Sequence, residues 1–262
     1  MATERTASAP AGAHITIRGL SKQFNGAVVY DNFDLDIPRG KLVSVFGPNG
    51  CGKSTLINLI AGLIPADGGQ ILFGGKPIGE TKIGYVFQNY RDALFPWLRS
   101  IDNIAYPLKM MQLPAPERRL RMDGLIESLG VKIDLMRYPY ELSGGQQQLI
   151  SIMRALVVRP EVLFLDEPFS ALDYEMKLFM RDKLQEIFAA TETTMLLVSH
   201  DLEEAVYLAD QVVLLTRRPT HVAEIVPFAA LRPRHPEGTL VSAEYVRAKA
   251  RCLEVFQREV RR

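Results

Sequence analysis

The sequence predicts an α/β fold in which a largely parallel sheet is covered by helices on both faces. Three observations support this prediction. Strand-like apolar segments alternate with helical segments, a glycine-rich loop at 47–55 joins a strand to a helix, and the stretch from about 90 to 158 is helical in pattern. Such alternation is typical of parallel strands, because two of them are usually connected through a helix. We therefore expect a core sheet with an inserted helical subdomain.

The strands are expected where short apolar or alternating segments are bounded by turn residues. The segment 28–37, VVYDNFDLDI, alternates apolar and polar residues, and the segment 41–46 leads directly into the glycine-rich loop. Two short strands follow before the helical stretch, and further strands return after it. The expected strands are 14–20, 28–37, 41–46, 70–73, 83–87, 162–166, 194–199 and 211–216.

The helices are expected between Pro and Gly breaks, at 100–112, 115–130 and 144–158, with a final helix from about 242. The first residues are small and polar, which is typical of a disordered leader rather than a signal peptide. The expected organisation is a leader at 1–13, one domain at 14–230 and a loop with the final helix at 231–262. Within that domain, we expect the core at about 14–89 and 159–230 and the helical subdomain at about 90–158.

Bulk composition is that of an ordinary globular protein. Of 262 residues, 47% are hydrophobic and 23% are charged, and the formal charge of +1 gives no bulk reason to expect nucleic-acid binding. The longest apolar runs fall far short of the roughly 18 residues of a membrane-spanning helix. The two cysteines, Cys51 and Cys252, are too few for a disulfide framework. A reactive thiol at Cys51 is a minor alternative, because the loop needs only the backbone at that position.

The glycine-rich loop carries the first specific motif. Gly47, Gly52, Lys53 and Ser54 match G-x-x-x-x-G-K-[ST] between an expected strand and an expected helix, which is the context that this motif requires. The backbone amides of such a loop wrap phosphates, the lysine neutralises their charge and the serine hydroxyl binds Mg²⁺. These residues predict a P-loop nucleotide hydrolase. The other loop residues expected at the nucleotide are Pro48, Asn49, Gly50, Cys51 and Thr55.

Two acidic residues end a later apolar strand. Asp166 closes the segment EVLFLD, so its carboxylate would emerge at the edge of the sheet, where a magnesium ligand is needed to complete a P-loop site. Glu167 follows directly and is the candidate that activates or positions the attacking water. An acid that merely caps the next helix is the alternative. The presence of the P-loop favours the catalytic interpretation.

A second glycine-rich turn, LSGGQ at 142–146, is not explained by a P-loop alone. Ser143, Gly144 and Gly145 stand directly before an expected helix. Free backbone N–H groups at a helix start bind anions, so this turn is a second candidate phosphate cradle within one chain.

Taken together, these motifs resemble those of the ATP-binding subunit of an ABC transporter. LSGGQ lies about twenty residues before LFLDEP, SALD and SHD follow in order, and the resemblance spans roughly 14–225. It implies a RecA-like P-loop NTPase core with an antiparallel β subdomain and an inserted α-helical subdomain, which uses ATP and Mg²⁺. It also implies two subunits, expected to be identical, that pack head to tail with each ATP between the P-loop of one and the LSGGQ turn of the other. In that dimer, Ser143, Gly144, Gly145 and Gln146 would bind the nucleotide of the partner.

The same resemblance assigns roles to further residues. Phe24 matches the aromatic that stacks on adenine, with a plain core phenylalanine as the alternative. Asp173 matches a loop that crosses the dimer interface, and His200 matches the switch histidine at the γ-phosphate. Leu149 is a departure, because the family usually has an arginine there, which puts in doubt a polar contact near the loop of Gln88. The expected catalytic residues are Glu167, His200 and Gln88, and the expected metal ligands are Ser54, Gln88 and Asp166.

The segment 87–110 resembles the part that meets the permease in importers for nitrate, sulfonates and taurine. Phe95, Pro96 and Trp97 would help to form a groove for the permease, whereas burial of Trp97 in the subdomain core is an equal alternative. The resemblance implies an ATPase that is peripheral to the cytoplasmic face of the inner membrane and drives the import of a small anion. Its expected partners are transmembrane permease subunits and, through them, a periplasmic or extracellular substrate-binding protein, with no nucleic acid.

Two other functions remain open from the sequence. The first is a non-transport ABC ATPase that acts on the ribosome or on DNA, although the usual second cassette or long coiled-coil insertion is not seen. The second is a binding module that senses ATP without turnover, against which Glu167 and His200 argue.

Overall fold

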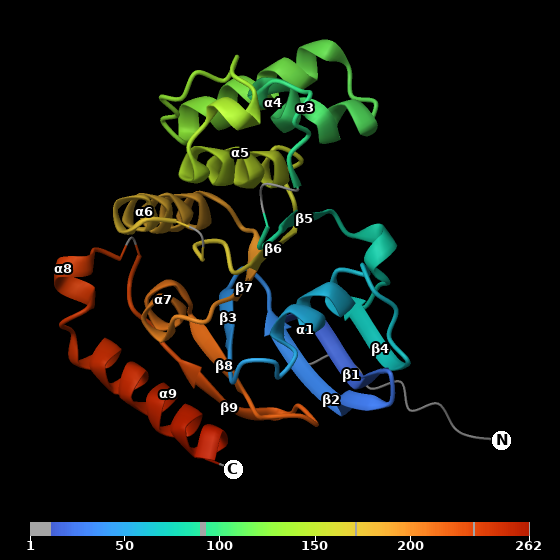
Figure 1. Ribbon diagram of the computed structural model, residues 1–262, viewed down its shortest axis with the longest axis vertical. Helices are drawn as coiled ribbons and strands as arrows, with labels where there is room; N and C mark the ends of the chain where they lie inside the picture. The colour runs from blue at the N-terminus through green and yellow to red at the C-terminus, as the bar shows by residue number, and fades with distance from the viewer. Residues whose placement is uncertain (1–11, 90–92, 171, 233, 262) are drawn as a thin grey trace.

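The computed structural model describes residues 12–89, 93–170, 172–232 and 234–261. Most of the expected leader, residues 1–11, therefore lies outside the described residues. Two sheets form the centre of the structure, and a layer of helices lies above the larger sheet in the view of Figure 1.

The larger sheet has six strands in the order β5-β6-β7-β3-β8-β9. All neighbouring pairs are parallel except β8 and β9, which confirms the predicted largely parallel sheet. The edge strand β9 was missed by the sequence analysis, because Val226 is its only buried residue and the segment lacks a clear apolar pattern. The strands are β3 (Leu42–Phe46), β5 (Ile83–Val86), β6 (Val162–Asp166), β7 (Thr194–Val198), β8 (Gln211–Leu215) and β9 (Val222–Pro227).

Both faces of this sheet are covered. Strands β3, β6 and β7 are buried at every residue, as expected for continuous apolar runs in a parallel sheet. Because side chains alternate along a strand, Val43 and Val45 pack into one core and Leu42 and Phe46 into another. Helix α1 (Lys53–Ile60) belongs to the first core. The second core includes residues of α5 (Gly144–Leu156), α6 (Tyr174–Ala190), α7 (Leu202–Leu208) and α9 (Ala243–Arg261).

The smaller sheet has three antiparallel strands in the order β2-β1-β4. Its apolar residues share the core of α1, so it packs on the same side of the larger sheet as that helix. This confirms the antiparallel β subdomain that the resemblance implied. The strands are β1 (Ala13–Phe24), β2 (Ala27–Pro38) and β4 (Gly68–Phe73), followed by a short 3-10 helix η1 (Ile78–Glu80).

The middle of the chain forms the helical layer. Helices α3 (Ser100–Met110), α4 (Ala115–Ser128) and α5 agree with the three predicted helices within a few residues, and the 3-10 helix η2 (Pro139–Glu141) precedes α5. Ile104 of α3 and Met122 of α4 belong to the same hydrophobic cluster as Leu163 of β6, so the layer and the sheet share one core. Among the described residues, no helix is both long enough and apolar enough to cross a bilayer.

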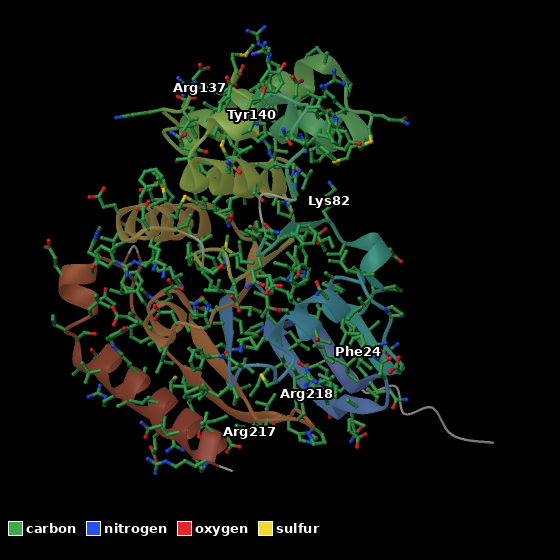
Figure 2. The ribbon with its side chains drawn as sticks, viewed as in Figure 1. Phe24, Lys82, Arg137, Tyr140, Arg217 and Arg218 are labelled. Carbon is green, nitrogen blue, oxygen red and sulfur yellow. The ribbon has the colours of Figure 1, made fainter. Side chains whose placement is uncertain are left out.

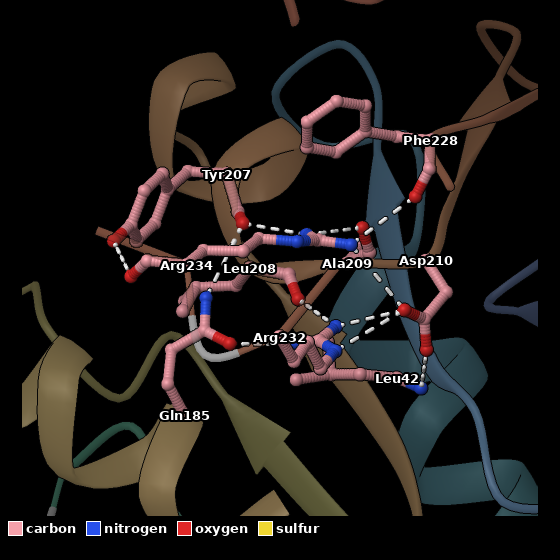
Figure 3. A network of polar contacts seen from close by, with 9 residues as sticks. All are labelled: Leu42, Gln185, Tyr207, Leu208, Ala209, Asp210, Phe228, Arg232 and Arg234. Atoms are coloured by element: carbon pink, nitrogen blue, oxygen red, sulfur yellow. Dashed lines mark hydrogen bonds and ion pairs between the residues drawn. The ribbon is translucent and has the colours of Figure 1, made fainter. Parts of the chain in front are cut away.

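A network of buried and half-buried polar groups ties the segment before α8 to the sheet (Figure 3). Its centre is Asp210 with Arg232 and Arg234, and we call these three residues the arginine clamp. Asp210 Oδ1 pairs with Arg232 at 2.9 Å and with Arg234 at 3.3 Å, while its Oδ2 accepts from Leu42 N at 3.0 Å. The two guanidinium groups also donate to the last carbonyls of α7 and to Phe228. The clamp thus joins the start of β3, the end of α7 and the segment before the short helix α8 (Pro236–Thr239).

Arg234 is the most enclosed member of the clamp, because its side chain has no exposed surface. Burial lowers the pKa of Arg234 to about 10, and the nearby Arg232 contributes in the same direction. The group is still charged at neutral pH, so its charge must be compensated within the protein. Carbonyl oxygens at a helix end are suitable acceptors, since they carry the negative end of the helix dipole.

Candidate active site

The P-loop connects the end of β3 to the start of α1. Gly52 caps this helix with φ of 116°, a conformation that disfavours any side chain. A Cβ at Gly52 would lie 2.7 Å from Val29 Cγ1, which is too close for any side chain. Both the backbone conformation and the lack of space therefore require glycine here. Asn49 and Gly50 are exposed at the tip of the loop, and Thr55 is half-buried in the first turn of α1.

Lys53 is 7% exposed and folds back over its own loop. Its Nζ donates to Gly47 O at 2.9 Å and to Pro48 O at 3.2 Å. Both acceptors are uncharged carbonyl oxygens, which hold the side chain in place over the loop. The loop therefore presents a fixed cation and free amides, which is the arrangement that a polyphosphate requires.

Ser54 and Asp166 meet beside the loop. Ser54 Oγ donates to Asp166 Oδ1 at 3.1 Å, although the two residues are 112 positions apart. Burial raises the pKa of Asp166, and the neighbouring Glu167 adds to this rise, while the bond from Ser54 opposes it. A hydroxyl and a carboxylate are hard oxygen ligands that suit Mg²⁺. Ser54 and Asp166 are therefore the residues that would hold the ion, which would neutralise phosphate charge when bound.

Replacement of Asp166 by asparagine is expected to stabilise the nucleotide-free protein at neutral pH. The folded-state pKa of Asp166 lies above the unfolded value, so the ionised form is less favourable in the folded state than in the unfolded chain. The substitution removes one buried charge that is unfavourable in the folded state. We therefore expect the thermal unfolding midpoint of Asp166→Asn to rise by a few degrees. The difference from the wild type should shrink as pH falls through the folded pKa.

Differential scanning fluorimetry between pH 5 and 8, with and without Mg-ATP, measures this effect. Asp123→Asn, at an exposed position of α4, is the matched control. The variant should also lose the stabilisation that Mg²⁺ adds to the nucleotide. An unfolding midpoint below that of the wild type at neutral pH would contradict the predicted cost of the charge.

Glu167 contacts both of the other predicted catalytic residues, so we call it the carboxylate hub. Its Oε2 accepts from Gln88 Nε2 at 2.7 Å and lies 3.2 Å from His200 Nδ1. These side chains follow the ends of β5, β6 and β7, which are neighbours in the sheet. Glu167 also has φ of 47°, in the left-handed region, which aims its side chain away from the line of the strand. Three separate sequence motifs therefore meet at one carboxylate oxygen.

Gln88 is paired with Glu167 and has no bond to Ser54 or Asp166 in the structure. The geometry thus brings Gln88 to the candidate base, and its expected role as a metal ligand stays a prediction. Tyr85 of β5 was not predicted as a site residue. Its hydroxyl donates to Asn58 Oδ1 at 2.7 Å, and Tyr85 also acts to lower the pKa of Asp166 against the larger effect of burial. No sequence signal marks Tyr85, because a tyrosine in an apolar strand is normally part of the core.

The LSGGQ turn forms a capping box at the start of α5. Ser143 Oγ accepts from Gln146 N at 3.3 Å, and Gln146 Oε1 accepts from Ser143 N at 3.0 Å. Gly145 is packed so closely that a Cβ would lie 2.1 Å from Met176 Cγ. Met176 N in turn donates to Asp173 Oδ1 at 2.9 Å, so the LSGGQ turn rests on the helix that Asp173 caps.

The structure does not bring this turn to the P-loop of its own chain. A pocket of about 880 Å³ lies at the mouth of the P-loop, and residues 143–146 and 173 are absent from its wall. In Figure 1, α5 lies in the upper layer and α1 in the lower part of the molecule. Each chain therefore carries two separate candidate phosphate cradles.

Phe24 ends β1 and is 44% exposed, so the alternative of a plain core phenylalanine was wrong (Figure 2). Lys22 Nζ lies 5.2 Å from the centre of its ring. An exposed ring is available for stacking on a base. Cys51 is 2% exposed, and burial raises the pKa of its thiol, which argues against the minor alternative of a reactive cysteine.

Trp97 is 71% exposed, so its burial in the subdomain core was also a wrong alternative. Its ring centre lies 5.5 Å from that of Phe95, which is half-buried. The apolar side chain of Leu149 is 3% exposed and belongs to the core. Arg154, farther along α5, instead donates to Ala93 O at 2.6 Å and lies over the Phe95 ring. This arginine supplies a polar contact between α5 and the segment after Gln88.

The P-loop, the pair of Ser54 and Asp166, and the carboxylate hub at Glu167 together define the site of a P-loop nucleoside triphosphatase. Comparison with known proteins agrees with this class, because residues 30–170 match the family described as ABC transporter. The chain belongs to the ABC transporter family.

Two curated relatives are similar to most of this domain. The sulfate/thiosulfate import ATP-binding protein CysA of Neisseria meningitidis is 43% identical over 212 residues, which are 77% of this chain and 58% of the relative. The spermidine/putrescine import ATP-binding protein PotA of Marinobacter nauticus is 42% identical over 206 residues, which are 77% of this chain and 55% of the relative. The chain thus spans somewhat more than half the length of these relatives. These two relatives are named for the import of sulfate, thiosulfate and polyamines, and neither is named for nitrate, sulfonates or taurine.

Solved structures show the same fold. The bacterial ABC transporter cassette MJ0796, in a dimeric structure, is 27% identical with a TM-score of 0.72, covering 83% of this chain and all of that chain. A second dimeric structure of MJ0796, in a post-hydrolysis state bound to ADP and Pi, has a TM-score of 0.71 with 25% identity.

Proposed function

We propose that the protein is the ATP-hydrolysing motor subunit of an ABC importer. The observation that carries this proposal is the convergence of Gln88 and His200 on Glu167 beside the P-loop. A carboxylate held by two hydrogen bonds can accept a proton from an attacking water, while Lys53 and an ion at Ser54 and Asp166 neutralise the phosphates. A phosphate-release assay with purified protein and Mg-ATP tests the proposal. ATP binding without phosphate release would instead make the protein an ATP-sensing module.

Two chains would complete each active site. Ser143 and the free amides of Gly144 and Gly145 start a 13-residue helix on a face apart from the P-loop pocket of their own chain. In a head-to-tail dimer, this helix start would meet the γ-phosphate bound by the partner, and ATP would favour the closed dimer. The dimeric structures of the similar cassette MJ0796 support this arrangement.

Replacement of Ser143 by arginine is expected to abolish ATP-dependent dimer formation. The long side chain would occupy the space of the γ-phosphate, while the P-loop of the same chain is untouched. We expect Mg-ADP affinity within about two-fold of the wild type, since the phosphate cradle at the P-loop is unchanged. Size-exclusion chromatography with light scattering, with ATP in a Glu167→Gln background, measures the dimer.

Loss of the helix cap could itself weaken the fold by about 0.5–2 kcal/mol, so a second variant is needed. Ser143→Asp keeps a good capping residue and places a negative charge at the phosphate, and it should block the dimer as well. Ser128→Arg, at an exposed end of α4, is the matched control. Normal dimer formation by both Ser143 variants would refute the shared site.

We further propose that the subunit acts on the cytoplasmic face of the inner membrane, where it drives separate permease subunits supplied by a substrate-binding protein. The exposed Trp97, packed beside Phe95, supports a docking site for the permease. The proposed cargo is a small anion such as a sulfonate, taurine or nitrate, and CysA is a relative that is named for sulfate and thiosulfate. Neighbouring reading frames for a permease and a secreted binding protein would support transport, and a neighbouring polyamine-binding protein would refute an anion.

A further inference from the structure

The outer wall of the P-loop pocket is built by a part of the chain to which the motifs assign no role. The pocket is lined by Gly47–Cys51, Glu167 and His200 of the motifs, by Phe46, and by four residues from the C-terminal part of the chain, which we call the outer wall. These four are Arg217, Arg218, Phe256 and Val260. The two arginines stand in the turn between β8 and β9, and the other two lie on the last turns of α9.

This turn is joined directly to the P-loop. The hydroxyl of Thr220 donates to Cys51 O, and Thr220 N donates to Val29 O at 2.8 Å. On the other arm of the turn, Leu215 packs so closely that a Cβ at Gly47 would lie 3.0 Å away. Thr220 is fully buried, so the turn cannot move without disturbing the backbone of the P-loop. The residues at its tip therefore have a fixed place relative to bound phosphate.

The last turn of α9 supports the same tip. Arg217 Nη2 donates to Val260 O at 2.6 Å, near the C-terminal end of the helix. The Phe256 ring lies 5.0 Å from that of Phe46, the residue just before the P-loop. One guanidinium of the pair is thus used to attach the turn to α9. The C-terminal helix is part of the wall of the pocket rather than a remote appendage.

Arg218 has its charge available for a ligand. Within the described part of the chain, it makes no hydrogen bond or ion pair, and it is exposed at the pocket (Figure 2). Burial raises the pKa of both Cys51 and Tyr30, and the charge of Arg218 opposes this rise in each, in agreement with a position close to the P-loop. Glu167 is the only acidic residue among the described residues that line the pocket. The outer wall is therefore suited to an anion.

We propose that Arg218 is a further nucleotide-binding residue, which contacts the phosphate chain of a nucleotide held by the P-loop, and that the bond from Arg217 to α9 positions it. The proposal rests on the proposed nucleotide binding at the P-loop. A guanidinium donates charge-assisted hydrogen bonds in a planar fork that fits phosphate oxygens. The contact adds affinity for the nucleotide and has no part in activating water.

Isothermal titration of the full-length chain with Mg-ADP tests this proposal, because ADP is not hydrolysed and needs no second copy. We expect Arg218→Gln to raise the Kd about five- to ten-fold, the effect of one partly exposed charged hydrogen bond. Arg218→Lys should recover part of the affinity, and the effect should shrink at high salt. In steady-state ATP hydrolysis, KM should rise while kcat stays within about two-fold of the wild type, because only binding is lost.

Two further variants separate positioning from general charge. Arg217→Gln should raise the Kd for Mg-ADP less than Arg218→Gln does. The double variant should raise this Kd by less than the product of the two single increases, since both residues act through one contact. Arg247→Gln, at the exposed start of α9, is the matched control and should bind Mg-ADP as the wild type does. Unfolding midpoints without nucleotide show that each variant is folded.

Wild-type affinity of the Arg218→Gln variant for Mg-ADP would overturn the proposal. If Arg218→Gln bound Mg-ADP normally but failed to dimerise with ATP in a Glu167→Gln background, the proposal would also be wrong. Arg218 would then contact the second copy and not the nucleotide. If the wild type itself bound no Mg-ADP, the proposed nucleotide site would fail instead, and the two failures are thus distinguishable.

Discussion

Replacing Glu167 with glutamine is expected to lower steady-state ATP hydrolysis about 10²- to 10⁴-fold, the usual contribution of a general base. The amide is nearly isosteric with the carboxylate and cannot accept the proton of the attacking water. ATP binding should persist, because Lys53, Ser54 and Asp166 are unchanged. Since closure would no longer be followed by hydrolysis, the variant should accumulate as a dimer in ATP.

Phosphate release and light scattering, measured on the same preparation, test both parts of this prediction. Glu161→Gln is the matched control, because Glu161 precedes β6 and Glu167 follows it, so the two residues lie at opposite ends of the same strand. Hydrolysis within ten-fold of the wild type would remove Glu167 from the role of base. His200, at 3.2 Å from the same carboxylate oxygen, would then be the next residue to test.

Replacing Arg234 with alanine is expected to destabilise the fold by about 3–5 kcal/mol, the usual cost of breaking a buried charged network. The substitution removes donors to Tyr207 O, Ala209 O and Phe228 O and leaves these buried carbonyls with fewer partners. It also removes one of the two cations that pair with Asp210. The end of α7 and the segment that leads to α9 should loosen together.

Urea unfolding monitored by circular dichroism measures the loss. Arg251→Ala is the matched control, because Arg251 is also an ion-paired arginine but lies exposed on α9, and its removal should change the midpoint little. A midpoint for Arg234→Ala equal to that of Arg251→Ala would show that the clamp carries no stability. The double variant Arg234→Ala with Asp210→Asn should be less destabilised than the sum of the single changes, since the two groups share one network.

The sequence by itself determined every described strand except β9, together with the P-loop and the order of the motifs. These features depend on local patterns: β3, β6 and β7 are continuous apolar runs, and the backbone conformation at Gly52 is one that favours glycine. The edge strand β9 was missed, because its buried and exposed residues follow no clear period. The exposure of Phe24 and of Trp97 also could not be derived, since an aromatic side chain looks alike in a core and on a surface.

Only the tertiary structure decided which distant residues meet. It joined Gln88 and His200 at Glu167, set Gly145 against Met176, and placed the turn of Arg218 and the end of α9 in the wall of the P-loop pocket. The arginine clamp likewise joins distant segments, because Asp210 contacts both Leu42 and Arg234. Such contacts depend on strand order and helix packing over long separations. Local periodicity carries no information about them, because it records which face of an element is buried and not what covers that face.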